Sequence, residues 1–246
     1  MGKRLAAARV RRPRQLRLAE WVYRQLATAL LEGDFAAGEA LPPENELAAQ
    51  FGVSRMILRQ ALHRLADLGL LAVRQGGATR VLALDESSNL QILELLYRLA
   101  PSTGTPLVDP RDAVEKQFLQ GLSLVEIAER RATAGELAQV CGELERDARA
   151  VNDEPGFARL EERFWRALAR AGHNRILQME VNWWYQNLPE RPRAEHLVPS
   201  PLAARLEFYR QLAVRLRARD RAAAYYLEAV RPILRALSDP LEEPIS

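Results

Sequence analysis

The spacing of hydrophobic residues predicts helices over most of the chain. Apolar residues recur every three or four positions over 16–32 and 55–68, which places them on one face of a helix. Two short runs, 70–74 and 79–84, flank a glycine pair and predict a β-hairpin instead. After residue 88 the pattern is helical throughout, and we expect helices at 88–99, 110–131, 134–150, 156–171, 175–188, 201–218 and 220–237.

Residues 42–68 predict two helices joined by a tight turn. Pro42 and Pro43 suit the first turn of a helix, which needs no amide donors. Gly52 can end that helix in the left-handed conformation, and Ser54 is a favoured N-cap for the next one. A short helix, a glycine-containing turn and a second helix form the helix-turn-helix pattern.

The second of these helices carries two arginines on one side. Arg55 and Arg59 are four residues apart and lie off the apolar stripe. Positive charge in the first turn opposes the helix dipole, which favours a site where an anion docks. Arginine can also bind guanine O6 and N7 with two hydrogen bonds. Two solvated arginines are the alternative, but the turn before them and the hairpin after them favour DNA recognition.

The segment LPPENELAAQFGVSR, followed by LRQALHRLADLGLL and a glycine-rich hairpin, resembles the winged helix-turn-helix of the GntR family of bacterial transcription regulators. The resemblance covers about residues 18–84. It implies that Arg55 and Arg59 contact DNA and that Gly76 and Gly77 form the wing tip. Many relatives have an arginine where this chain has Asn45. The candidate DNA-binding residues are Arg55, Arg59, Met56, Asn45, Gln75, Gly76, Gly77 and Thr79.

The basic N-terminal segment and the tip of the predicted hairpin can each be interpreted in two ways. Residues 1–17 contain seven basic side chains and no acid, so they predict an arm that follows phosphates or a tail that is merely solvated. The hairpin tip, with Arg74 and Arg80 on either side, predicts a probe of the minor groove or backbone, or an ordinary turn. Its place directly after the recognition helix favours the wing.

Composition limits the remaining choices. The net charge is +3, so the whole chain is not a general polyanion binder. Cys141 is the single cysteine, which excludes an internal disulfide and suits a reducing cytoplasm. No apolar run approaches the ~18 residues of a spanning helix, and no apolar signal core follows the basic N-terminus. We therefore expect a cytoplasmic protein without a membrane partner.

The rest of the chain predicts an all-helical domain at 85–240, after a basic arm at 1–17 and a winged helix-turn-helix domain at 18–84. The segments FARLEERFWRALARAGHNRIL and LEFYRQLAVRLRARDRAAA resemble helices of the FadR (FCD-type) subfamily. That resemblance implies a bundle of six or seven helices that binds an effector and forms a homodimer. The fold class is therefore mainly α with a small β-ribbon.

Many members of that subfamily hold a divalent metal with one Asp and three His. Here that register falls on Glu161 and Trp165, and near Tyr209 and Arg231. The three histidines, His63, His173 and His196, stand elsewhere, so we predict no bound metal and no other cofactor. The candidate effector-binding residues are Glu161, Trp165, Tyr185, Tyr209 and Arg231.

The same aromatic residues leave two possibilities for the bundle interior. They could line a pocket for a small carboxylate or for an acyl, lipid-like ligand, since FadR-type relatives without metal include acyl-CoA sensors. They could instead fill the space and leave no pocket. The run Trp183–Tyr185 could resemble a stacking platform, but neighbours on a helix point in different directions, which favours core packing or a dimer seam.

No converging catalytic set is apparent. Glu161 and Glu162 are adjacent on one helix and cannot converge on one substrate, and Cys141 has the pattern of a core residue. The sequence therefore predicts a dimeric, sequence-specific DNA-binding regulator, usually a repressor in the family, of a pseudo-palindromic operator, with affinity tuned by an effector. The alternatives are a constitutive DNA-binding dimer without effector, and an enzyme or small-molecule-binding protein with a vestigial winged helix.

Overall fold

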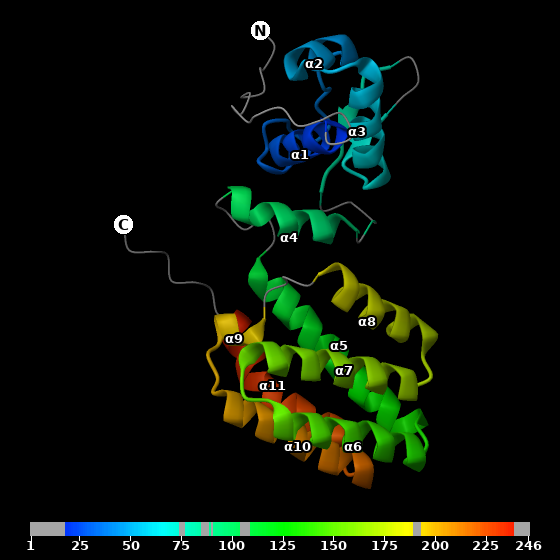
Figure 1. The fold of residues 1–246 in the computed structure, drawn as a ribbon, viewed down its shortest axis with the longest axis vertical. Coiled ribbons are helices and arrows are strands. Elements are labelled where there is room, and N and C mark those ends of the chain that lie inside the picture. The colour runs from blue at the N-terminus through cyan, green and yellow to red at the C-terminus, as the bar shows by residue number, and fades with distance from the viewer. Residues whose placement is uncertain are drawn as a thin grey trace, which may run out of the picture. The chain divides into compact units, whose positions relative to one another are not determined.

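The computed structural model describes residues 18–73, 77–84, 89, 91–103, 109–188 and 193–238, with side chains left out at 98–103, 195, 196 and 238. The chain divides into two compact units, 1–107 and 108–246 (Figure 1). Both units are mainly helical, which confirms the fold class predicted from the sequence. No helix among the described residues is both long and apolar enough to cross a lipid bilayer.

The N-terminal unit contains α1 (Leu18–Leu31), α2 (Glu44–Phe51), α3 (Arg55–Asp67), β1 (Leu71–Ala72), β2 (Arg80–Val81) and α4 (Gln91–Thr103). The C-terminal unit contains α5 (Pro110–Arg131), α6 (Ala134–Ala150), α7 (Glu154–Ala171), α8 (Arg175–Asn187), α9 (Ala194–Leu197), α10 (Leu202–Ala218) and α11 (Ala222–Ser238). The division between units falls after residue 107, whereas the sequence predicts a functional boundary at 84/85. Because α4 contacts α1, this helix is grouped with the N-terminal unit, and the boundary at 84/85 stays a prediction.

Helices α2 and α3 form the predicted helix-turn-helix. Gly52 ends α2 with a φ of 61°, a left-handed conformation that glycine adopts without a side-chain clash. The Ser54 Oγ atom accepts a hydrogen bond from the Ile57 amide, 3.4 Å away, and so caps α3. The apolar side of α3, with fully buried Leu58 and Leu65, packs against α1 and α2. This packing decides which side of α3 faces solvent.

A short antiparallel ribbon follows α3. Its strands β1 and β2 pair Leu71 with Val81 and Ala72 with Arg80, so the paired part is shorter than the predicted runs. A third segment that the sequence did not indicate, residues 38–41, pairs with the other edge of β2.

The pairing of residues 38–41 involves several backbone hydrogen bonds. The Leu41 amide donates to the Thr79 carbonyl at 2.8 Å, and the Val81 amide donates to the Glu39 carbonyl at 3.0 Å. The Arg80 guanidinium also donates to the Gly38 carbonyl at 2.8 Å. The segment that leads into α2 is thereby fixed to the ribbon.

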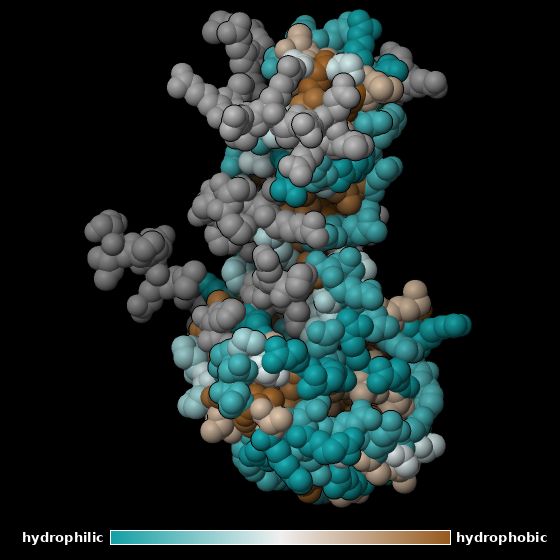
Figure 2. Space-filling view, in the orientation of Figure 1, coloured by the Kyte–Doolittle hydropathy of each residue, from teal (hydrophilic) through white to brown (hydrophobic). Residues whose placement is uncertain are grey.

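Helices α5 to α11 surround one apolar core. Helix α6 packs on α7 and α10, and α5 packs on α7 and α11 (Figure 1). The core includes leucines from three of these helices that are almost completely buried, namely Leu137, Leu160, Leu168, Leu212 and Leu216. On the side shown in Figure 2, the outer surface of this unit is mainly hydrophilic, with a few apolar patches.

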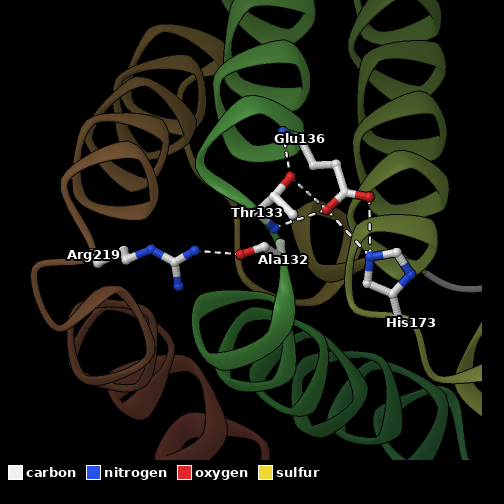
Figure 3. Close-up of polar contacts among 5 residues, drawn as sticks. All are labelled: Ala132, Thr133, Glu136, His173 and Arg219. Carbon is white, nitrogen blue, oxygen red and sulfur yellow. Dashed lines mark hydrogen bonds and ion pairs between the residues drawn. The ribbon is translucent and has the colours of Figure 1, made fainter.

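Three helix corners meet at one end of the bundle (Figure 3). At the start of α6 the Glu136 amide donates to Thr133 Oγ1 at 3.2 Å, and the Thr133 amide donates to the Glu136 carboxylate at 2.8 Å. His173, between α7 and α8, lies 3.0 Å from the same carboxylate. Arg219, between α10 and α11, donates to the Ala132 carbonyl. A single capping box thus connects the α5–α6 corner with the α7–α8 corner.

This corner predicts a pH-dependent contribution to stability. Hydrogen bonds from the Thr133 amide and hydroxyl, and then from His173, lower the pKa of Glu136 from 4.5 to about 2. A carboxyl group with a lowered pKa stabilises the fold above its unfolded pKa and loses that contribution as pH falls toward 2. We expect Glu136→Gln to lower the melting temperature near neutral pH, and the difference from wild type to shrink between about pH 4.5 and 2. A difference that stays constant across this interval would contradict the expectation.

Two proline-containing stretches outside the predicted helices are helical in the structure. Helix α4 continues past Pro101 to Thr103, and α9 is a one-turn helix inside a stretch predicted to be loop. Helix α11 is not split at Pro232, which lies inside it. Pro232 is exposed, so water can hydrate the carbonyl that loses its amide partner.

Asp220 was considered as the N-cap of α11, but the Glu129 carboxylate accepts from the Ala222 amide at 3.0 Å instead.

Candidate DNA-binding surface and bundle site

The solvent face of α3 carries three of the residues predicted to contact DNA. Arg55, Met56 and Arg59 are all exposed, Met56 by 68% and the Arg59 side chain by 63%. The opposite face is buried through Ala61 and Leu65, so the three side chains face away from the core of their own unit. A methionine exposed to this extent is typical of a contact surface rather than of a core.

Arg59 is held in place by a neighbouring helix. Its Nε atom donates to the Glu44 carboxylate at 2.8 Å, across the turn between α2 and α3. The Glu44 side chain is 30% exposed and stands in the first turn of α2. The sequence gives no indication of this pair, because Glu44 and Arg59 stand on different helices 15 residues apart.

A groove of about 870 Å³ lies beside these residues. Its lining comes from the start of α2, from α3 and from the ribbon, and includes Glu44, Arg59, His63, Gly77 and Thr79. Two of the wing candidates, Gly77 and Thr79, therefore lie on the same groove as Arg59.

The remaining DNA-binding candidates differ in what the structure says of them. Asn45 is exposed on α2, next to Glu44. Gln75 and Gly76, together with the basic arm at 1–17, lie outside the described residues. Their roles stay predictions.

Within the bundle, three of the effector-site candidates form one hydrogen-bonded chain. The Trp165 indole N–H donates to the Tyr209 hydroxyl at 3.0 Å, and that hydroxyl donates to the Glu161 carboxylate at 2.8 Å. The Arg193 guanidinium donates to the other oxygen of Glu161, also at 2.8 Å. Trp165 and Tyr209 are 6% and 4% exposed, so the aromatic part of this chain is shielded from water.

Aromatic rings and one glycine surround this hydrogen-bonded chain. Trp165 and Tyr226 meet edge to face with ring centres 5.7 Å apart. A Cβ atom at Gly121 would lie 2.2 Å from the Tyr226 hydroxyl and 3.2 Å from the Trp165 ring, so only glycine fits there. Burial raises the pKa of Tyr209 and of Tyr226 well above the ordinary value, and both phenols remain protonated. The Tyr209 hydroxyl therefore donates to Glu161 as a neutral group.

The other two effector-site candidates are placed differently. Tyr185 is partly buried, and its charge interaction with Tyr209 puts it near the hydrogen-bonded chain. Arg231 is exposed on α11 and does not share the buried position of Trp165 and Tyr209. The arginine that pairs with Glu161 is Arg193, next to α9, in a proline-rich stretch where the periodicity gave no indication of a site.

Cys141 has no features of a nucleophile. It is completely buried in the bundle core, and burial raises the pKa of its thiol to about 11. A reactive cysteine needs a thiolate near neutral pH, so this residue is a core residue, as its pattern predicted.

Comparison with known sequences decides the family. The profile described as bacterial regulatory proteins, gntR family, matches residues 18–81, and the FCD domain profile matches residues 119–230. An uncharacterized HTH-type transcriptional regulator of Mycobacterium tuberculosis is 31% identical over 176 residues, which cover 70% of this chain and 68% of that protein. The chain belongs to the GntR family.

Other relatives agree with this assignment, and one solved structure shares the fold. The fatty acid metabolism regulator protein of Erwinia tasmaniensis is 33% identical over 180 residues, 72% of each chain. The putative L-lactate dehydrogenase operon regulatory protein of Escherichia coli is 31% identical over 179 residues, 70% of this chain and 65% of that one. A structure of Lar, described as controlling expression of the Listeria monocytogenes agr system, has a TM-score of 0.52 at 17% identity, covering 92% of this chain and 98% of that one.

This GntR-family protein is a DNA-binding transcription regulator with an FCD domain, and not an enzyme. The resemblance that the residues indicated, to the GntR family and its FadR subfamily, is confirmed. The exposed face of α3 belongs to the part that matches the gntR profile, and the hydrogen-bonded chain from Trp165 to Glu161 belongs to the part that matches the FCD profile.

The residues at the metal-binding register of the subfamily do not fit a divalent metal. An indole N–H such as that of Trp165 only donates hydrogen bonds, and a guanidinium such as that of Arg231 is positively charged. The Glu161 carboxylate already accepts hydrogen bonds from Tyr209 and Arg193. Among the described residues, no group of three His, Cys, Asp or Glu side chains is arranged to hold a metal ion. That the protein binds no metal stays a prediction.

Proposed function

We propose that this GntR-family regulator reads its operator with Arg55, Met56 and Arg59, which lie on α3 in the major groove. The observation that carries the proposal is the exposed side of α3, where Arg55 and Arg59 stand one helical turn apart. Arg59 also lines the groove that the ribbon lines. The B-DNA major groove is about 12 Å wide and admits one α-helix. Arginine fits guanine, and the Met56 side chain fits an apolar base edge.

The residues around α3 would then contact the backbone and the neighbouring groove. On this proposal the wing residues Gln75, Gly76, Gly77 and Thr79 probe the adjacent groove or the phosphates. Asn45 donates a hydrogen bond to a phosphate without adding charge, and the basic arm supplies attraction that does not depend on base sequence.

The protein would act as a cytoplasmic homodimer on a pseudo-palindromic site. Support comes from apolar side chains on α5 and α8 that are exposed in the single chain, namely Leu119 (50%), Ile176 (72%) and Met179 (62%). A two-fold interface would cover such side chains and place two α3 helices on successive half-sites. Sedimentation of the full chain as a monomer at micromolar concentration would overturn this part of the proposal.

The FCD domain would bind a small effector, a carboxylate or an acyl, lipid-like molecule, near Glu161, Trp165, Tyr185 and Tyr209. Two relatives are named for fatty acid metabolism and for an L-lactate dehydrogenase operon, which supports these two classes. With no metal to hold an anion, the ligand carboxylate would compete with Glu161 for Arg193. Because Arg231 is exposed, it stays a candidate only if it contacts the ligand from outside the hydrogen-bonded residues Trp165, Tyr209 and Glu161. Repression, relieved by the ligand, is the direction usual in the family.

A DNA-release experiment tests the effector. A duplex is first selected by the full protein from a random-sequence pool, and its binding is followed by fluorescence anisotropy with added L-lactate or a long-chain acyl-coenzyme A. We expect one of the two classes to change the dissociation constant by about 5- to 150-fold, the range of common allosteric coupling. Tyr209→Phe, which removes the hydrogen bond to Glu161 and keeps the ring, should change the ligand response more than the ligand-free DNA affinity.

A second candidate function has an observation in its favour. The close packing around Gly121, Trp165 and Tyr226 leaves no space even for a methyl group at position 121. This supports a constitutive DNA-binding dimer whose bundle serves assembly alone. If neither ligand class alters DNA binding and native mass spectrometry of the purified protein finds no bound molecule, this candidate is preferred.

A further inference from the structure

The pairing of Arg59 with Glu44 places an acid on a surface that is expected to face DNA. Glu44 contacts Arg59 at 2.8 Å, and both line the groove between α3 and the ribbon. A carboxylate near phosphates weakens binding to every DNA sequence, because like charges repel. Glu44 therefore needs a role that offsets this loss.

The geometry of the guanidinium group indicates that role. Arginine has five N–H donors in a fixed plane, one on Nε and four on the two Nη atoms. Glu44 accepts from Nε, and the Arg59 side chain is still 63% exposed. With Nε engaged, the outer edge formed by the two Nη atoms is the edge left for DNA. Two parallel donors on one edge match the O6 and N7 acceptors of guanine.

We propose that Glu44 is a positioning residue that makes Arg59 a reader of guanine instead of a general phosphate contact. The inference rests on the proposed base-reading role of Arg59 and adds what sets its selectivity. The carboxylate fixes the direction of the guanidinium and neutralises part of its charge, so the attraction between Arg59 and a phosphate is weakened. The two Nη donors stay available for the O6 and N7 acceptors of guanine.

The chain offers a matched control in Glu46. Both acids stand in the first turn of α2, where each favours the positive end of the helix dipole. Glu46 is exposed, and the contact with Arg59 is made by Glu44. A change in net charge or helix stability should therefore affect Glu44→Gln and Glu46→Gln alike, whereas the loss of guanidinium positioning should affect only the first variant.

The experiment compares full-length wild type, Glu44→Gln, Glu46→Gln, Arg59→Ala and the double variant Glu44→Gln/Arg59→Ala. Each is titrated against the pool-selected duplex and a scrambled duplex at several salt concentrations. We expect Glu44→Gln to lower the ratio of selected to scrambled affinity by about three- to tenfold, a part of what a bidentate arginine contributes. The salt dependence on scrambled DNA should steepen by about one released counterion, because Arg59 becomes free to bind a phosphate.

The controls separate this inference from the proposed function. Glu46→Gln should leave both the affinity ratio and the number of released counterions unchanged, and the double variant should match Arg59→Ala. If Arg59→Ala lowers the ratio but Glu44→Gln and Glu46→Gln behave alike, the positioning role is overturned and base reading by Arg59 stands. If Arg59→Ala leaves the ratio unchanged, both proposals are overturned. A rise in the ratio for Glu44→Gln would make Glu44 a competitor of DNA and also overturn the inference.

Discussion

Replacing Arg59 with alanine is expected to reduce the preference for operator over scrambled DNA by about 5- to 150-fold, which corresponds to about 1–3 kcal/mol for one bidentate base contact. The reason is positional: Arg59 is exposed on the face of α3 away from the buried Ala61 and Leu65, and its Nε atom donates to the Glu44 carboxylate. Arg59→Ala should leave the melting temperature nearly unchanged, because the side chain contributes little to the core. Fluorescence anisotropy on the two duplexes measures the preference.

Arg12→Ala provides the contrast for this prediction. An arginine in the basic arm would contact phosphates, so its loss should weaken binding to both duplexes about equally. The salt dependence of binding should become shallower by about one released counterion. If Arg59→Ala lowers the affinity for both duplexes equally, Arg59 does not read bases and is another contact to the DNA backbone.

Replacing Gly121 with alanine is expected to destabilise the bundle by about 1–3 kcal/mol, the usual cost of overpacking a core. The added methyl group would lie 2.2 Å from the Tyr226 hydroxyl, and Tyr226 is itself 2% exposed and pressed against Trp165. A rigid, enclosed phenol cannot move aside as the end of a flexible chain could. The urea midpoint, followed by tryptophan fluorescence, should fall, and the emission of Trp165 in the folded state should change.

Gly142 in α6 is the matched control. Its nearest neighbour to an added Cβ would be the Arg146 guanidinium at 3.7 Å, an ordinary contact. Alanine there should stabilise the protein by up to about 1 kcal/mol, because glycine inside a helix carries an entropic cost. If Gly121→Ala raises the urea midpoint as Gly142→Ala does, the packing around Tyr226 is looser than the distances indicate.

The local pattern was sufficient to predict the helix-turn-helix. Gly52, Ser54 and the apolar stripe of α3 each act within a few residues, so their effect can be derived from the sequence before any tertiary contact is known. Exposure of Arg55 and Arg59 followed from the same stripe. Most helix bounds in the FCD domain were also predicted to within two residues, because capping and periodicity are local.

Contacts between distant segments could not be predicted in this way. Arg193 reaches Glu161 from a proline-rich stretch 32 residues away, and residues 38–41 join β2 without an alternating pattern of their own. Glu44 and Arg59 are each ordinary on their own helix, and only the turn between α2 and α3 brings them together. In all three cases the partner is decided by packing, which a single sequence without related sequences does not reveal.

The backbone link between residues 38–41 and β2 has a consequence for how recognition can evolve. Because the segment that leads into α2 and strand β2 share one hydrogen-bonded ribbon, main-chain atoms link the wing to the helix-turn-helix whose second helix is proposed to read DNA. Side chains on the reading helix can then be exchanged without altering how the domain sits on a duplex. New operator sequences become accessible by single substitutions, while the docking pose is inherited unchanged.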